Sequence, residues 1–308
     1  MRPAHPVRLI WLGLLLLALA LAGGALLMRH AGGGMQAPTP PSQPGVAPAS
    51  VAELLALRAA ADWQPRWLRG KGAVLVIQFP NLWAQGRALN RAAALIEKSG
   101  TRRDQVLTDA GLQAALAAAD DNEASYFLGH DYRADDLARF FSLAQAQQVT
   151  LNADELRLRQ LLLDAGLLQT AAPGQFNGNS DRALISFSAE QADDPATPQD
   201  EGMDSQRRES VLRHELSHGR YFTDARYRDH CRHFWTELLS ETERQTWRRY
   251  LDRLGYDPAN EELMVNETQA MLMHTPDTRD FDAASLGIGA RELEGLRARF
   301  REGMPVEE

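Results

Sequence analysis

Hydrophobic residues along this chain follow three patterns. Residues 9–28 form one uncharged run of mostly Leu and Ala, while residues 73–79 and 183–188 form two short apolar runs. Most of the other hydrophobic residues recur every three to four positions, as they do in amphipathic helices. The short runs contain β-branched and aromatic residues, and Pro80 closes the first, so we predict that both are buried strands.

The helical pattern predicts an α+β fold that is predominantly helical, with a small sheet near 73–79 and 183–188. Asn152 and Glu155 form a capping-box-like helix start, and Pro258 suits the first position of another helix. The polar segments 172–182 and 190–204 are predicted to be loops. The predicted helices lie in 52–68 (a helix followed by a turn), 90–98, 105–170, 205–219, 226–254 and 258–274.

The long apolar run predicts export. About twenty apolar residues can cross the roughly 30 Å hydrocarbon core of a membrane as a helix, and arginines flank residues 9–28 on both sides. We therefore expect either an inner-membrane anchor, with the body facing the periplasm or the extracytoplasmic side, or a secreted protein. The second outcome follows if a signal peptidase cuts the Ala20-Leu21-Ala22 pattern after Ala22.

Composition and charge divide the chain further. Residues 1–50 contain three arginines and no acidic residue, so they carry +3 of the net charge of −8 and leave −11 for the body. Such an acidic body excludes nucleic acid as the main partner, and the single cysteine, Cys231, excludes a disulfide scaffold. The expected segments are an anchor or signal peptide (1–28), a Gly/Pro/Ala linker (29–50), a mostly helical upstream lobe (51–170) and a C-terminal region (171–308).

The C-terminal region contains a metal-binding pattern, His214-Glu215-Leu216-Ser217-His218. Residues four apart lie on one face of a helix, so His214 and His218 can bind the same metal ion. Glu215 can reach water beside that ion and act as a general base. Catalytic zinc sites commonly have three protein ligands and one open position, so a third ligand is expected elsewhere.

Glu267 is the best candidate for the third ligand. Four residues share its helical face and are apolar, and a carboxylate within an apolar stripe is costly unless it is paired or bound to a metal. These neighbours are Leu263, Met264, Ala270 and Met271. Asp224 is the rival, because it lies ten positions after His214, as in metzincin-like enzymes. However, Tyr221 occupies the position where that pattern has glycine.

The HELSH sequence followed by Asn-Glu-Thr-Gln-Ala at 266–270 resembles the gluzincin zinc metallopeptidases. The resemblance implies a zincin-like catalytic region within 171–308 in which His214, His218 and Glu267 hold Zn²⁺. It further implies that Glu215 is the general base, and that the partner is a peptide or protein substrate. Gluzincins also tend to present an edge strand to an extended substrate, and residues 183–188 are the candidate strand.

The chain departs from the family at one supporting position. An Asp that supports a zinc histidine in thermolysin-like members is replaced by Met271, so Asp224 or Glu209 would have to take that role. Two other functions therefore stay open: a catalytically inactive, membrane-tethered zinc-binding scaffold, whose metal would have four protein ligands, and an amidase that acts on a cell-wall amide. The candidates for stabilising the oxyanion are His274, Tyr221 and Tyr250.

Overall fold

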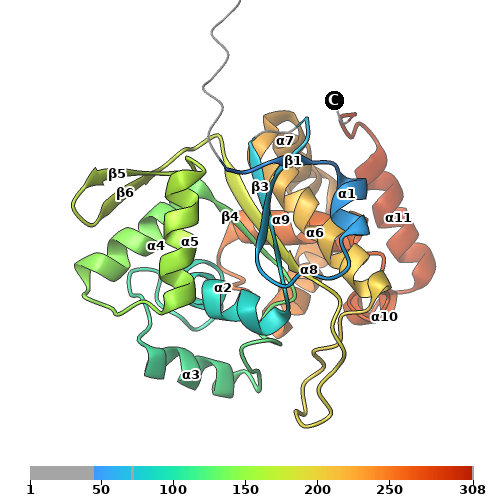
Figure 1. Cartoon of the computed structure of the whole chain (residues 1–308). Coiled ribbons are helices and arrows are strands. Elements are labelled where there is room, and N and C mark those ends of the chain that lie inside the picture. Colours follow the sequence, from blue (N-terminus) through green and yellow to red (C-terminus); the bar gives the residue numbers. More distant parts are fainter. Residues whose placement is uncertain (1–44, 71–72, 307–308) are drawn as a thin grey trace, which may run out of the picture. The chain divides into compact units, whose positions relative to one another are not determined.

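A five-stranded mixed sheet lies at the centre of the computed structural model, which describes residues 45–70 and 73–306 (Figure 1). Its strand order is β1-β2-β3-β7-β4, with β2 and β4 antiparallel to their inner neighbours and β3 parallel to β7. A separate hairpin pairs β5 with β6. The strands are β1 (Pro48–Ala49), β2 (Gln64–Leu68), β3 (Val74–Phe79), β4 (His130–Arg133), β5 (Leu168–Ala172), β6 (Gln175–Gly178) and β7 (Ala183–Ser188).

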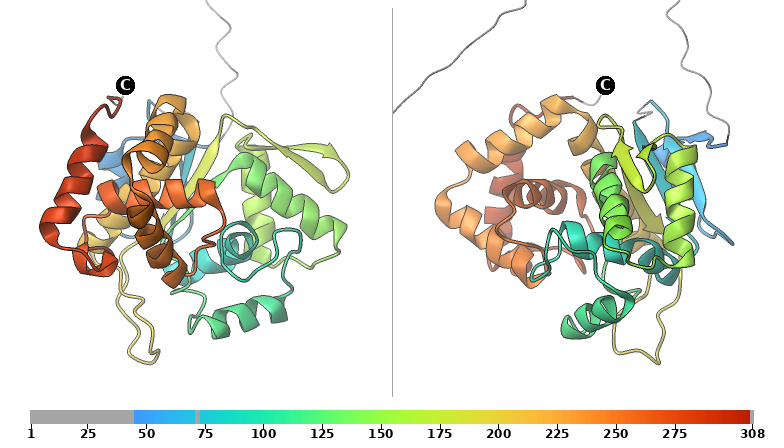
Figure 2. Two further views of the ribbon diagram at one scale, coloured as in Figure 1. Left: turned by 180° about the vertical axis from the view of Figure 1, so that it is seen from behind. Right: turned by 90° about the vertical axis from the view of Figure 1, so that its left-hand side faces the viewer.

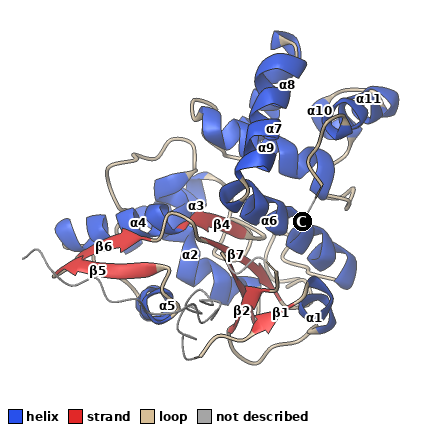
Figure 3. Cartoon of the chain, turned by 90° about the horizontal axis from the view of Figure 1, so that it is seen from above, coloured by secondary structure: helices blue, strands red, loops and turns tan. Residues whose placement is uncertain are grey.

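Helices cover both faces of this sheet, so the fold is mixed α/β with helix predominating. The view from above separates α2, α4 and α5 on one side of the sheet from α6 and the C-terminal helices on the other (Figure 3). The α-helices are α1 (Val51–Ala56), α2 (Leu82–Ile96), α3 (Asp109–Ala118), α4 (Ala134–Ala146), α5 (Ala153–Asp164), α6 (Ser205–Thr223), α7 (Ala225–His233), α8 (Glu241–Arg253), α9 (Glu261–His274), α10 (Ala283–Leu286) and α11 (Ala290–Arg301), and a π-helix, η1, spans Phe234–Leu238.

The alternation of side chains along β3 explains the two layers. Leu75 and Ile77 are fully buried against the core formed with α2, α4 and α5, whereas Val74 and Val76 pack with Leu212 of α6. Successive residues of a strand point to opposite faces, so an unbroken apolar run requires cover on both faces. The apolar strands predicted at 73–79 and 183–188 are confirmed as β3 and β7, and their pairing places strands from either side of residue 170 in one sheet.

The C-terminal helices form a second hydrophobic core on the α6 side of the sheet (Figure 2). Trp235 of η1, Trp247 of α8 and Phe300 of α11 are almost completely buried in it, together with Met264 and Leu272 of α9. One side of α9 packs into this core, and α9 also packs against α6. Two helices that are far apart in sequence are therefore packed side by side.

Several predicted elements are corrected. Residues 64–68 form strand β2 rather than the end of a helix and turn, and the predicted loop 172–182 contains part of the β5–β6 hairpin, whose turn uses Gly174 at φ +74°. The helix predicted at 90–98 begins earlier, at Leu82, because Asn81 caps it by accepting from Ala84 N. The capping box at Asn152 and Glu155 is confirmed.

Two predicted C-terminal helices also differ. The segment 226–254 is not one helix but α7, η1 and α8, interrupted where Ser240 forms a capping box with Glu243. The helix predicted to begin at Pro258 begins at Glu261, with Asn260 as its N-cap.

The apolar run 9–28, the cleavage pattern before residue 23 and most of the predicted linker lie outside the described residues. Within the described part of the chain, no helix is both long and apolar enough to cross a membrane.

Candidate metal centre

Helices α6 and α9 bring the three predicted ligands together. The Nε2 atoms of His214 and His218 are 2.9 Å apart, as their spacing of four residues on α6 requires. Each of these atoms also lies 3.7 Å from a carboxylate oxygen of Glu267 on α9. Zinc–ligand bonds of 2.0 to 2.2 Å in a tetrahedron give ligand–ligand distances of about 3.3 to 3.6 Å. The three side chains therefore converge with nearly the spacing that a single ion needs.

Thr275, immediately after α9, sets the orientation and tautomer of His214. Its Oγ1 lies 2.8 Å from His214 Nδ1 and donates to Ala270 O at 3.1 Å. The hydroxyl therefore accepts from the Nδ1–H group, which leaves the Nε2 lone pair free for a metal. Burial lowers the pKa of His214 to about 4, so the ring is neutral at physiological pH, as a metal ligand must be.

Two further acidic side chains reach the same place. Asp131 comes from β4, and its Oδ2 lies 3.7 Å from His218 Nε2 while its Oδ1 accepts from Asn266. Glu97 follows the end of α2 and accepts from Tyr132 OH at 3.2 Å. Three groups of three residues overlap here, and within each group the possible ligand atoms lie within 4.8 Å of one another. The groups are His214–His218–Glu267, Asp131–Glu215–His218 and Glu97–Asp131–Glu267.

The electrostatics of this cluster fit a bound cation. Glu97, Glu215 and Glu267 are all at least 96% buried, and Asp131 is close to each of them. Burial, followed by repulsion from Asp131, raises the pKa of Glu97 and Glu215 well above their ordinary values, and burial raises the pKa of Glu267 to about 7. One oxygen each of Glu215 and Glu267 is buried without a hydrogen-bond partner. A positive charge among these groups would offset the repulsion between the buried carboxylates and would give the unpartnered oxygens a partner. The residues present can hold a metal ion.

Glu215 is held by close contact with the backbone before β4. A Cβ atom at Gly129 would lie 2.2 Å from Glu215 Oε1 and 2.6 Å from its Cδ. Only glycine therefore leaves room for this carboxylate. Glu215 is almost completely buried, and it also lines a cavity.

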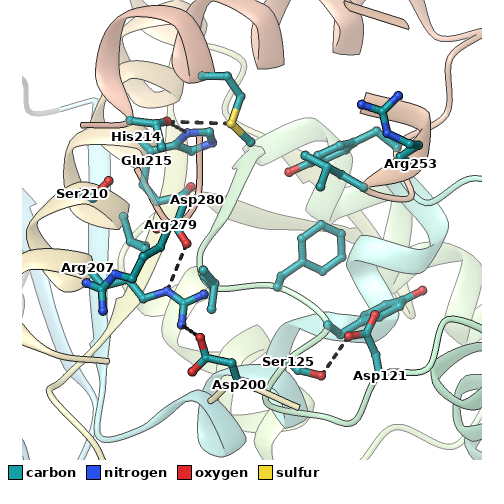
Figure 4. A pocket seen from close by; sticks show the side chains of 18 of the residues that line it. Asp121, Ser125, Asp200, Arg207, Ser210, His214, Glu215, Arg253, Arg279 and Asp280 are labelled. Carbon is teal, nitrogen blue, oxygen red and sulfur yellow. Dashed lines mark hydrogen bonds and ion pairs between the residues drawn. The ribbon is translucent and has the colours of Figure 1, made fainter. Parts of the chain in front are cut away.

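That cavity has a volume of about 430 Å³ and opens beside His214, the first of the three predicted ligands (Figure 4). His214 and Glu215 lie on one wall, and Asp121 and Ser125 lie across from them. Tyr256 also lines the cavity, and its hydroxyl interacts with Glu267. A short antiparallel bridge, with Ser99 N donating to Gly255 O and Asp257 N to Glu97 O, places Tyr256 opposite Lys98.

The structure separates the other candidate site residues from the cluster. Asp224 is the N-cap of α7 and accepts from the backbone N–H groups of Arg226 and Tyr227, and it belongs to none of the described groups that could hold a metal ion. Glu209 pairs with Arg213 on the surface, and neither acid supports a histidine ligand. Thr275 supports His214 instead.

The three oxyanion candidates lie away from the cavity beside the metal ligands. The predicted alternatives His274, Tyr221 and Tyr250 do not line it. His274 contacts Tyr227 OH and lines a different cavity, while Tyr250 OH contacts Met271 and Asp280 O. Strand 183–188, predicted as the edge strand, is the fourth of five strands as β7, so β4 forms that edge.

Five residues near the ligands were missed by the sequence analysis: Glu97, Gly129, Asp131, Tyr256 and Thr275. No motif spacing links them to the HELSH sequence, which lies 85 positions beyond Gly129. A weak signal was present in Gly129-His130-Asp131, where glycine, a histidine and an acid stand together between predicted helices. Comparisons with models of protein families, with curated proteins and with solved structures find no match to this chain.

Proposed function

We propose that the chain is a zinc-dependent peptidase of the gluzincin type. The observation that carries the proposal is the convergence of His214, His218 and Glu267 beside a cavity whose wall also contains Glu215. The apolar run within residues 1–28 supports an activity outside the cytosol, on an inner-membrane anchor or as a secreted protein.

When bound, Zn²⁺ supplies a Lewis acid that polarises a peptide carbonyl and acidifies water. The chain's own residues provide the proton transfers and the orientation. Glu215 lines the cavity and has one carboxylate oxygen without a hydrogen-bond partner, and in this proposal its carboxylate accepts a proton from the attacking water and later donates it to the leaving amine. Tyr256 lines the cavity next to Glu267, and in this proposal its hydroxyl turns from Glu267 to donate to the carbonyl oxygen as negative charge develops there.

In this proposal β4, and not β7, is the edge strand along which the substrate binds. The segment 125–128 leads into β4 and lines the cavity, while Gly129 touches Glu215. An extended peptide that follows this segment passes directly in front of the general base.

The test combines metal content with turnover. The full-length protein should contain about one zinc per chain and should cleave unstructured peptides, with products read by mass spectrometry. Glu215→Gln should keep the zinc and abolish cleavage, whereas His218→Ala should lose the zinc. Turnover retained by Glu215→Gln would refute the assignment of the base.

A structural zinc site is the second candidate, and the position of Asp131 favours it. A fourth protein ligand would close the coordination sphere, and Asp131 Oδ2 lies as close to His218 Nε2 as Glu267 does. If the site is structural, Asp131→Asn should lower zinc affinity and thermal stability together, with wild-type protein inactive on all peptides. If the site is catalytic, Asp131→Asn should retain about one zinc per chain.

A further inference from the structure

Lys98 has an unusual position. The sequence contains only two lysines among its 33 basic residues, Lys71 and Lys98, and Lys98 is the one that the structure describes. Its side chain is 94% buried, yet it lines the same cavity as His214 and Glu215. Its Nζ atom is not among the buried side-chain atoms that lack a partner, so the ammonium group stays accessible from the cavity.

The contacts of Lys98 leave its charge unmatched. Its Nζ atom lies 4.0 Å from the centre of the Tyr126 ring and 4.4 Å from that of Phe127. With the other described residues it forms neither an ion pair nor a side-chain hydrogen bond, and Asp121 and Glu97 act on it only at longer range. Cation–π contacts recover part of the lost hydration, but they leave the three N–H donors unused.

The other cations around the cavity are already engaged. Arg207 pairs with Asp200 and Asp280, and Arg279 pairs with Asp204 and Asp277. Arg253 donates to Ser285 O. Among the described residues that line this cavity, only Lys98 and Arg253 are cations without an ion pair, and Lys98 alone of the two is buried and forms no hydrogen bond.

Lys98 is also close to the reacting end of the cavity. Phe127 lies beneath its ammonium group, and Gly129, two residues later, touches Glu215. Two residues of extended chain span at most about 7 Å. One residue of an extended peptide covers about half of that distance, so an anionic group held by Lys98 belongs to a residue near the bond that Glu215 attacks.

We propose that Lys98 is a specificity-determining residue that binds a carboxylate of the peptide substrate, one to three residues from the scissile bond. The inference rests on the proposed peptidase function. The carboxylate is either the C-terminal α-carboxylate or an Asp or Glu side chain, since both offer the same acceptor atoms. Tyr126 and Phe127 hold the ammonium in place and pack against the alkyl part of the bound residue.

Peptide pairs that differ only in the carboxylate test this inference. Acetylated heptapeptides of one sequence carry a single Glu at successive positions, each with a Gln counterpart, and each is made with a C-terminal acid or amide. We expect the full-length, zinc-loaded protein to favour one carboxylate position by roughly 10- to 100-fold in kcat/KM. The Glu/Gln arm and the acid/amide arm identify the source of the carboxylate.

Lys98→Met removes the charge and keeps much of the side-chain volume. We expect it to lose the preference mainly through KM, while zinc content, thermal stability and cleavage of the neutral peptides are kept. Arg253→Met is the matched control, because it removes an exposed cation of the same cavity lining that already donates to Ser285 O, and it should keep the preference. An equal loss on all peptides in Lys98→Met, or an equal loss of preference in Arg253→Met, would overturn the inference.

Binding measurements separate this inference from the peptidase proposal. Calorimetry with the Glu215→Gln protein should show carboxylate peptides binding more tightly than their amide counterparts, and the added Lys98→Met substitution should remove that difference. Equal binding of both kinds refutes carboxylate recognition whatever the turnover. A binding preference without any cleavage by the wild-type protein refutes the peptidase and leaves the carboxylate site standing.

Discussion

Gly129→Ala tests whether Glu215 is held where the chemistry requires it. The added methyl carbon would lie 2.2 Å from Glu215 Oε1, whereas ordinary contact begins near 3.4 Å, so the carboxylate must withdraw by about 1.2 Å. Gly129 does not have a positive φ, so alanine is compatible with the backbone there. The three atoms nearest to the added methyl carbon all belong to Glu215, so we expect the perturbation to act on that side chain first and to keep the contacts between His214, His218 and Glu267.

The expected effect on turnover is large. A misplacement of about 1 Å in a catalytic group costs roughly 100-fold in rate, which corresponds to about 2.7 kcal/mol. We expect Gly129→Ala to lower kcat by this factor and to keep about one zinc per chain, measured on the same protein sample. Gly295→Ala on α11 is the control, because a Cβ there meets no atom within 4 Å and should leave turnover unchanged.

A thermodynamic cycle gives the same test without a substrate. Overpacking of this kind costs about 1 to 3 kcal/mol, so Gly129→Ala should lower the free energy of unfolding by that amount. In a Glu215→Ala background the clashing carboxylate is gone, and the same substitution should cost almost nothing. Equal destabilisation in both backgrounds, or loss of zinc from Gly129→Ala, would refute the reasoning.

Three further predictions concern the surroundings of the site. Thr275→Val removes the acceptor of His214 Nδ1–H and should weaken zinc binding about 10- to 100-fold in chelator competition, whereas Thr275→Ser should preserve it. Asp224→Ala should keep zinc but lose about 1 kcal/mol of stability to urea, because it removes the α7 cap rather than a ligand. Arg279 lowers the pKa of Asp204 and Asp277, so its ion pairs stabilise the fold above the ordinary carboxyl pKa and lose that effect as pH falls through the lowered values. Arg279→Gln should therefore lower Tm at pH 7, with the difference shrinking toward pH 2, and a pH-independent difference would contradict it.

Local periodicity was enough to predict the central part of the site. Two histidines four apart on one helix lie on one face whatever surrounds them, and the structure places their Nε2 atoms together. Glu267 was predicted from its apolar neighbours, because a buried carboxylate on such a face needs compensation. The strands β3 and β7 could also be predicted from the sequence. A strand that is buried on both faces has apolar residues at every position, so its sequence is an unbroken apolar run.

Interruptions of regular structure were harder to predict. The helical pattern of 226–254 hides a break at Leu239, although Ser240 and Glu243 have the spacing of a capping box. Strand β2 was also missed, because its sequence is only half-buried and gains its structure from pairing with β3. At β2, tertiary pairing outweighed the local preference, whereas the break before α8 follows a local capping signal within a continuous helical pattern.

The sequence by itself determined the metal-ligand pattern on α6, the apolar face of α9 and the two central strands, because each depends on contacts within a few residues. Only the tertiary structure decided which groups surround them. Asp131 reaches His218 because β4 pairs with β7, which lies more than fifty residues later in the chain. Lys98 reaches the cavity because the end of α2 pairs with the segment after α8. Such neighbours depend on pairing and packing between segments that are far apart in sequence. No periodic pattern in the amino-acid sequence indicates which distant segments pair, so these neighbours could not be predicted from it.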